Sequence, residues 1–431
     1  MPIWVFTIPI QVFTMDRCCC SRWSDPSVHD APKHAPWKIE RVETDLKAGE
    51  VHVHVALPRG EHWVCPECHA GAPIHDHQER VWRHLDTCQF HTFVHARVPR
   101  LNCPTHGVRQ LTVPWAEPGS QFTALFEVLA IDWLKDASIS AVSKYLRITW
   151  DEAAGVQERA VRRGLARRAF EPAQYVGVDE TSFQKRHEYV TIASDLERGR
   201  VLFVGDHRTQ ATLDQFWLGL PDDHLRAIKA VAMDMCAPYI QSTLMHVPQA
   251  DEKIVFDKFH IAQNLGQAVD QVRRDEHRRL SAQGDDSLKG TKFNWLRNPD
   301  QLKDAYAFHA LRRRLHRMSR AWELKQAAME VFALRAPWRA RRQFESWFRW
   351  AVRSKLRPFV RVARTLKRHW DQIENYFRHR ITNAGAEAIN TKVQQVKARS
   401  RGFRNRERFK MAIYFHCGGL DLYPAGVRRG Q

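Results

Sequence analysis

No run of about 20 consecutive apolar residues occurs in this sequence of 431 residues, although a helix that crosses a bilayer needs such a run. The sequence therefore argues against a membrane protein. The apolar stretch at residues 1–15 has no positively charged start and no small-residue cleavage site, which disfavours a secretory signal. We expect residues 1–35 to be disordered or a mis-annotated start. Internal repeats are also lacking.

Acidic residues are in the minority, with 48 Asp and Glu against 67 Lys and Arg, which gives a net charge of +19. This excess favours a polyanionic partner, most often nucleic acid, because cationic side chains displace the counterions condensed on phosphates. The nine cysteines are odd in number, and three are adjacent at positions 18–20. Such a pattern is a poor disulfide framework and favours a reducing cytoplasm.

Charge is distributed unevenly along the chain. Residues 171–270 have 9 Lys and Arg against 15 Asp and Glu, whereas residues 271–370 have 26 against 9. The second segment is rich in Arg, Leu, Ala and Trp at helical spacing, so we expect a basic helical module. We expect its arginines to face outward and its six tryptophans to pack in the core, at positions 295, 322, 338, 347, 350 and 370.

Two short motifs predict a zinc site. Each presents two ligands three positions apart, and β-like sequence flanks both: Cys65-Pro-Glu-Cys68 and Cys103-Pro-Thr-His106. Three thiolates and one imidazole suit a closed tetrahedral site for one structural zinc, which leaves no position for a reactive water. Cys88 or a nearby histidine is an alternative for one of the ligands.

Three helices are predicted after the zinc motifs, with a tight break before the third. Thr149 and Glu152 form a capping box at the start of this third helix. The pattern indicates a helix-turn-helix, and we predict DNA contacts from basic residues of the third helix, namely Arg159, Arg162, Arg163 and Arg167. A solvated three-helix linker is the alternative.

Two acids are predicted on strands. Asp179 lies in a β-rich run from Tyr175, two more β-rich runs follow, and Asp234 ends a later apolar run. The order of strands and helices, βββαβαβ, is typical of RNase H-like folds, in which two strand acids and one helix acid converge on two divalent cations. Carboxylate oxygens suit magnesium, and two ions about 3.5–4 Å apart promote in-line phosphodiester displacement.

The third acid must come from a helix beyond the basic segment. Glu387 lies in such a helix, which Thr382 or Asn383 could cap. The competing acids are Asp371 and Glu374. Two further residues, Asp257 and His260, follow a strand, where they could assist proton transfer or simply cap and pack the next helix.

These motifs resemble the ISL-three family of bacterial insertion-sequence transposases. The resemblance rests on Asp179-Glu-Thr, Ala232-Met-Asp234-Met, Phe256-Asp257-Lys-Phe-His260 and the segment from Thr382 to Asn390, and it covers roughly residues 36–424. It implies that Asp179, Asp234 and Glu387 match the family's DDE acids, which hold two magnesium or manganese ions. It also implies that residues 271–370 match the family's helical insertion.

We therefore predict an α/β fold: an RNase H-like mixed sheet with a large α-helical insertion, preceded by a small zinc-binding domain and a helix-turn-helix. The expected domains are a zinc-binding domain at 36–115, a helix-turn-helix at 116–170, the first catalytic part at 171–270, the basic insertion at 271–370, and the catalytic helix with a basic end at 371–431. Further DNA contacts are predicted from Arg312, Arg313, Arg314, Arg341, Arg342, Arg401 and Arg404.

The expected function is DNA transposition: binding of the terminal inverted repeats, cleavage at the element ends, and transfer of 3′-hydroxyl strands to target DNA. The expected partners are double-stranded DNA and further copies of the chain, in a homodimer or larger assembly. The expected location is the bacterial cytoplasm, on the nucleoid. An RNase H-like nuclease or resolvase is one alternative. A catalytically inactive, transposase-derived DNA-binding regulator is another.

Overall fold

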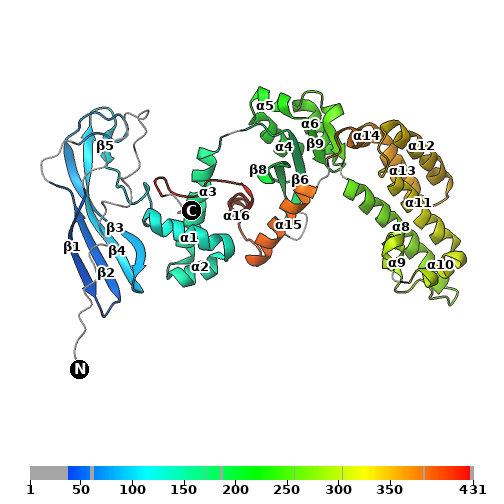
Figure 1. Cartoon of the computed structure of the whole chain (residues 1–431), viewed down its shortest axis with the longest axis horizontal. Coiled ribbons are helices and arrows are strands. Elements are labelled where there is room, and N and C mark those ends of the chain that lie inside the picture. The colour runs from blue at the N-terminus through cyan, green and yellow to red at the C-terminus, as the bar shows by residue number, and fades with distance from the viewer. Residues whose placement is uncertain are drawn as a thin grey trace. The chain divides into compact units, whose positions relative to one another are not determined.

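The computed structural model describes residues 37–58, 63–169, 171–184, 188–256, 258–302, 304–381 and 384–427. The chain divides into two compact units, one of residues 1–168 with 420–431 and one of residues 169–419 (Figure 1). The expectation for residues 1–35 lies outside the described residues. Within the described ranges, no helix is both long and apolar enough to span a membrane.

The first unit begins with a five-stranded sheet in the order β1-β2-β4-β3, with β5 paired to β4. The strands are β1 (Lys38–Asp45), β2 (Glu50–Ala56), β3 (Ile74–Thr87), β4 (Phe90–Cys103) and β5 (Gly107–Gln110). Side chains alternate between the two faces of a strand, so the valines of β2 face a core with Trp37, Trp82 and Trp115. The histidines of β2 lie on the other, half-buried face.

Three capped helices complete this unit: α1 (Ala124–Asp136), α2 (Ile139–Leu146) and α3 (Trp150–Arg167). The predicted capping box is confirmed, since Thr149 and Glu152 each bond the other's backbone N–H at the start of α3. Arg147 ends α2 with a left-handed φ of 55°, which makes the tight break. The residues from Leu420 belong to this unit, whereas the sequence predicts that they lie at the end of the catalytic domain.

The second unit has a five-stranded sheet in the order β10-β9-β6-β7-β8. Its strands are β6 (Tyr175–Gln184), β7 (Glu188–Asp195), β8 (Arg200–Asp206), β9 (Ala230–Met233) and β10 (Ile254–Phe256). The first three are antiparallel, and β9 and β10 run parallel to β6. Helices α4 (Gln210–Leu218) and α5 (Asp222–Ala227) precede β9, and α6 (Ala237–His246) and α7 (Ala250–Lys253) precede β10. This order confirms the predicted RNase H-like fold.

A helical region follows β10. It contains α8 (Lys258–Ser281), α9 (Lys292–Leu296), the short 3-10 helix η2 (Pro299–Gln301), α10 (Ala305–Arg314), α11 (His316–Val331), α12 (Pro337–Arg353), α13 (Arg357–Arg368) and α14 (Trp370–His379). Four of the six tryptophans are buried, but Trp338 and Trp350 are 62% and 39% exposed. The prediction that all six pack inside is wrong for these two, because other residues of α12 already fill its buried side, namely Ala340, Phe344, Trp347 and Ala351.

Helices α15 (Ala384–Arg399) and α16 (Arg406–Cys417) return to the sheet. They pack on one face of it, in a core that includes Phe183, Ile192, Ile389, Val393 and Phe409. The opposite face packs against α4 and α6 in a larger core that continues into the helical region. The predicted caps of α15, Thr382 and Asn383, lie outside the described residues.

Candidate active site and DNA-binding elements

Strand β6 carries two adjacent acids, Asp179 and Glu180, which point to opposite faces of the sheet because side chains alternate along a strand. Asp179 faces helix α15, since Asn390 Nδ2 donates a hydrogen bond to Asp179 Oδ2 at 2.5 Å. The helix can approach this closely because Gly177 has no side chain. A Cβ at Gly177 would lie 2.6 Å from Leu196 Cδ2 and 3.3 Å from the Ala386 Cβ of α15, so a larger residue would crowd this face of the sheet, including α15.

Helix α15 also carries Glu387, one turn before Asn390. One turn after Asn390, Gln394 Nε2 donates to Thr181 Oγ1 at 2.7 Å. Residues three or four apart share a helix face, so these contacts dock α15 along β6 in a single register. Glu387 lies on the same helix face and is exposed.

Asp234 directly follows β9. Gly177 pairs with Ala232 across the parallel strands β6 and β9, so Asp179 and Asp234, each two residues further on, lie at the same level of neighbouring strands. Asp234 Oδ1 is buried and, among the described residues, has no hydrogen-bond partner. A buried polar oxygen without a partner is costly, and a cation at this position would remove that cost.

The other oxygen of Asp234, Oδ2, lies 3.5 Å from Arg208. Arg208 also pairs with Glu180 at 2.7 Å. Burial raises the pKa of Glu180 to about 7, Arg208 opposes this shift, and Asp234 and Asp179 add to it. His260, in the first turn of α8, lowers the pKa of the same carboxyl. Asp257 lies outside the described residues.

The competing acids lie on α14. Glu374 is buried and accepts hydrogen bonds from Arg341 at 2.8 and 2.9 Å, and the exposed Asp371 also accepts one from Arg341. Helix α14 lies beside β10, where Asn375 bonds the Ile254 carbonyl oxygen, and β9 separates β10 from β6. Of the three candidates for the third acid, Glu387 is therefore the one on a helix that contacts Asp179.

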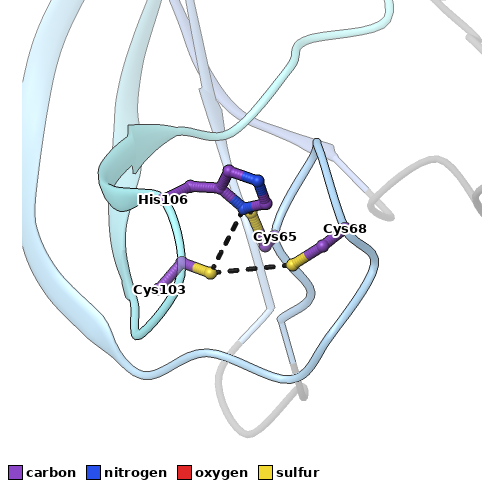
Figure 2. A group of neighbouring side chains, drawn as sticks. All are labelled: Cys65, Cys68, Cys103 and His106. Atoms are coloured by element: carbon purple, nitrogen blue, oxygen red, sulfur yellow. Dashed lines mark hydrogen bonds between the residues drawn. The ribbon is translucent and has the colours of Figure 1, made fainter.

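The first unit contains a second potential metal site, in which all four predicted ligands lie together. Cys65, Cys68, Cys103 and His106 bring one ligand atom each within 4.8 Å of one another (Figure 2), and no other His, Cys, Asp or Glu group in the described ranges does so. The sulfurs of Cys68 and Cys103 are 3.6 Å apart, and His106 Nδ1 is 3.7 Å from the Cys103 sulfur. A tetrahedron with zinc–sulfur bonds of about 2.3 Å has edges of about 3.8 Å, so the spacing suits zinc.

The surroundings of this quartet also favour metal binding. Backbone N–H groups lower the pKa of the Cys65 and Cys103 thiols, which favours the thiolates that bind zinc. The second ring nitrogen of His106 lies 3.6 Å from Glu67, and such a carboxylate orients a ligating imidazole. Cys88, the alternative ligand, is exposed and does not belong to the quartet.

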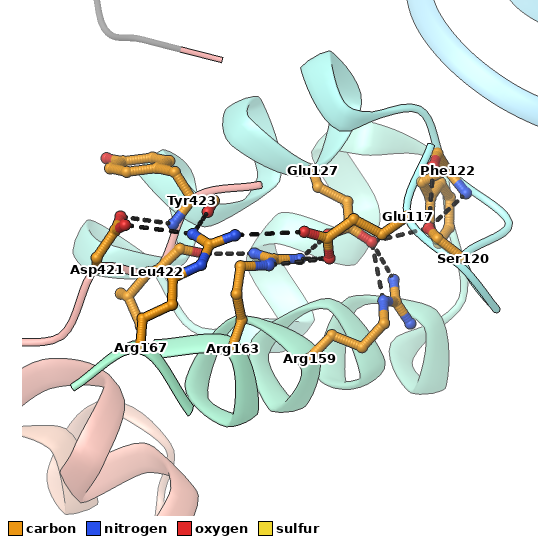
Figure 3. Close-up of polar contacts among 10 residues, drawn as sticks. All are labelled: Glu117, Ser120, Phe122, Glu127, Arg159, Arg163, Arg167, Asp421, Leu422 and Tyr423. Carbon is orange, nitrogen blue, oxygen red and sulfur yellow. Dashed lines mark hydrogen bonds and ion pairs between the residues drawn. The ribbon is translucent and has the colours of Figure 1, made fainter. Parts of the chain in front are cut away.

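Three of the arginines predicted to bind DNA from α3 instead make contacts within the first unit (Figure 3). Arg163, whose side chain is 7% exposed, pairs with the buried Glu127 at 2.8 Å and with Glu117 at 2.5 Å. Arg159 also pairs with Glu127, at 2.7 Å. These arginines neutralise acids of their own unit, so less of their positive charge is available to phosphates.

Arg167 is held by the C-terminal residues of the chain. It donates to Asp421 at 3.2 Å and to the Tyr423 carbonyl oxygen at 2.6 Å. Arg163 donates to the Leu422 carbonyl oxygen in the same segment. Of the four predicted arginines, Arg162 alone remains mostly solvent-exposed, at 70%.

The other predicted DNA-binding arginines also divide into those that pair with protein groups and those that are exposed. Arg312 stacks on Trp322 and pairs with Glu323 at 2.7 Å, and Arg341 is occupied by the acids of α14. Arg314 lies 3.4 Å from Asp285 but is 65% exposed. The remaining candidates, Arg313, Arg342, Arg401 and Arg404, are exposed. Sequence reasoning missed Arg208, whose only signal was its place shortly after a strand.

Comparison with protein families identifies the region that contains the candidate active site. A model of ISL3 DDE transposases, described as "Transposase", matches residues 176–413, which is more than half of the chain. The chain belongs to the ISL3 transposase family. This ISL3 match spans the strands and helices that carry Asp179, Asp234 and Glu387. It confirms the resemblance inferred from the motifs.

The first unit matches two further ISL3 models. One, the zinc-finger of transposase IS204/IS1001/IS1096/IS1165, matches residues 61–106 and contains the complete Cys and His quartet. The other, the helix-turn-helix domain of transposase family ISL3, matches residues 111–161. The first unit of this ISL3 family member therefore combines a zinc ribbon with a helix-turn-helix.

Two relatives align over most of their length. The transposase for insertion sequence element IS1001 of Bordetella parapertussis is 25% identical over 390 residues, which cover 87% of this chain and 94% of the relative. The transposase for insertion sequence element IS1557, from two strains of Mycobacterium tuberculosis, is 26% identical over 372 residues, which cover 79% and 82%. Similarity to these ISL3 relatives thus extends over both units.

Proposed function

We propose that this ISL3 family member binds the terminal inverted repeats of its insertion sequence, cleaves DNA at the element ends, and joins the 3′-hydroxyl strands to target DNA. The observation that carries the proposal is the position of Asp179 and Asp234 at one level of two parallel strands, with a buried Asp234 oxygen that lacks a partner among the described residues. The names of both relatives, transposases for insertion sequence elements, support it.

Asp179, Asp234 and Glu387 would hold two magnesium or manganese ions. Bound in this way, such ions activate the attacking oxygen and stabilise the leaving oxygen of a phosphodiester displacement. The residues of the chain itself position the ligands: Asn390 orients Asp179, and Arg208 holds the outer oxygen of Asp234. Because the acids act as ligands and not as nucleophiles, we expect no covalent protein–DNA intermediate.

Recognition of the element ends belongs to the first unit in this proposal. One structural zinc would bind the quartet of Cys65, Cys68, Cys103 and His106. Exposed Arg162 is the arginine of α3 that remains a candidate for DNA contact. Since both element ends must be cut and joined together, a homodimer or larger assembly acts on the DNA in the bacterial cytoplasm, on the nucleoid.

Cleavage and gel-shift assays on one labelled element end test the proposal. Asp179→Asn, Asp234→Asn and Glu387→Gln should each abolish cleavage and leave binding within about twofold, because metal ligation is separable from base and phosphate contacts. Asp371→Asn is the matched control, since this acid is 84% exposed on α14 and should not affect cleavage.

The contrary outcomes separate the alternatives. Loss of cleavage in Asp371→Asn with full activity in Glu387→Gln would move the third acid to α14. Cleavage by all three acid variants would overturn the active site. A chain that binds the ends but never cuts them, with magnesium or manganese supplied, would be the inactive regulator. Equal cleavage of unrelated duplexes would indicate a nuclease, which needs no helix-turn-helix for end recognition.

A further inference from the structure

Helices α12 and α13 carry an almost purely positive surface. Residues 337–368 contain eleven Lys and Arg and a single acid, Glu345. Arg341 is occupied by the acids of α14. The other ten are exposed: Arg339, Arg342, Arg349, Arg353, Lys355, Arg357, Arg361, Arg364, Lys367 and Arg368. Among the residues that the structure describes, Lys367 is the only one of these ten that forms an ion pair.

The exposed residues follow one face of each helix. On α12, Trp338 is followed by Arg342, Glu345, Arg349 and Arg353, at spacings of three or four residues that keep them on one side. The exposed basic residues of α13 repeat the same spacing. The two faces adjoin, because Lys367 Nζ of α13 lies 3.4 Å from Glu345 Oε1 of α12, and the helices are neighbours in Figure 1. We call these ten residues and Trp338 the α12–α13 surface.

Trp338 lies at one end of this surface. It is 62% exposed, and the Arg339 guanidinium lies 5.1 Å from its ring centroid. Glu345 follows two turns later, which corresponds to about 10 Å along the helix. The indole therefore offers an accessible aromatic surface at the end of a basic surface, where a flat ring of a bound polyanion can stack on it.

We propose that the α12–α13 surface binds the cleaved DNA end, with its basic residues along the phosphates and Trp338 stacked on an unpaired base. Ten exposed cations beside a single acid match a polyphosphate backbone better than a protein surface of mixed charge. Bases inside a duplex are stacked on one another, whereas an unpaired base offers its face to an aromatic ring. This inference rests on the proposed function, because a transposase produces such ends.

Binding of the full-length protein to two fluorescent DNAs tests the stacking contact. One is a fully paired element end, and the other is the same end with a three-nucleotide unpaired 3′ tail. Trp338→Ala should weaken binding to the tailed DNA about tenfold, which is the scale of one base–aromatic stack, and binding to the paired DNA less than twofold. Trp338→Phe should restore most of the affinity.

A matched control is Phe293→Ala on α9. Phe293 is 63% exposed with Lys292 Nζ 5.7 Å from its ring centroid, but it lies outside the α12–α13 surface and should change neither affinity. Equal weakening on both DNAs by Trp338→Ala, or no weakening at all, would overturn the stacking contact.

Charge reversal tests the rest of the surface. Arg361→Glu combined with Arg364→Glu should weaken binding to both DNAs and reduce the salt dependence by a slope of about 0.9 for each phosphate that the variant no longer neutralises. Arg226→Glu, at an exposed arginine of α5, is the control and should have little effect. Unchanged affinity and slope in the double variant would overturn the surface, even in a protein that cuts element ends normally. A protein that shows the predicted binding changes but cuts no DNA would instead refute the proposed function alone.

Discussion

Asn390 donates a hydrogen bond to Asp179 across 211 residues of sequence, from a helix that follows the helical region to a strand that precedes it. The second oxygen of Asp179 accepts from the backbone N–H of Glu180 at 2.8 Å. Both carboxylate oxygens are therefore oriented by the protein itself. This arrangement preorganises Asp179, and it links the position of α15, and hence of Glu387, to the same acid.

Asn390→Ala should reduce cleavage of element ends about tenfold and lower the free energy of unfolding by about 1 kcal/mol, the usual contribution of one such hydrogen bond. Cleavage assays and urea unfolding measure the two effects. The control is Thr391→Ala, whose hydroxyl bonds the Glu387 carbonyl oxygen within the helix and should change cleavage less than twofold. Wild-type cleavage by Asn390→Ala would contradict a positioning role.

Arg163→Met and Arg162→Met make a matched pair on α3. Arg163 is 7% exposed and shares with Arg159 the neutralisation of Glu127, which is 1% exposed, so its loss leaves this buried carboxylate with one cation and should lower stability by about 2 kcal/mol. Arg162 is 70% exposed beside Glu158, so its replacement should change stability by less than about 0.5 kcal/mol. Denaturant unfolding measures the loss of stability in each variant. Equal losses would contradict a stabilising role for the buried ion pairs of Arg163.

Cys65→Ser or Cys103→Ser should remove about one zinc per chain and unfold the sheet of the first unit, because a small metal module depends on its ion for folding energy. Elemental analysis and limited proteolysis report the two effects. Cys88→Ser is the control, since Cys88 is exposed and outside the quartet. Zinc-free wild-type protein, purified without chelators, would contradict the site.

Acid should destabilise the first unit through His84. Burial lowers the pKa of His84 to about 4 from 6.5, and Arg83 adds to this shift. Between these two values the unfolded chain binds a proton that the folded chain does not, so stability falls as the pH drops from 6.5 towards 4. Urea unfolding of the full chain across this range should show the loss, and His84→Gln should flatten it. His77→Gln, at an exposed histidine of the same strand, is the matched control.

The fold was predictable where the signal is local. The strand order and the capping box at Thr149 follow from periodicity, spacing and residue type, and the structure confirms both. It also brings together the four side chains predicted to bind zinc. The fate of the α3 arginines was not predictable in this way. The acids that bury Arg163 lie 36 and 46 residues before it, and no helical pattern reveals a partner at such a distance.

The sequence also does not show which tryptophans are exposed. Helical spacing placed Trp338 and Trp347 in the same amphipathic segment, yet Trp347 is buried and Trp338 is exposed. The buried side of α12 was already filled by smaller and aromatic residues, and composition alone cannot tell which indole is left over. The pairing of Arg208 with Glu180 and Asp234 likewise depends on three separate segments that only the folded sheet brings together.

The bonds between Arg167 and the C-terminal residues form late in synthesis of the protein. Arg167 receives Asp421 and the Tyr423 carbonyl oxygen only after the whole intervening unit, residues 169–419, has been translated. The catalytic unit is therefore complete on the ribosome before the helix-turn-helix gains its last partners. Prematurely terminated chains do not form these bonds, so we expect them to compete poorly with full-length transposase for element ends.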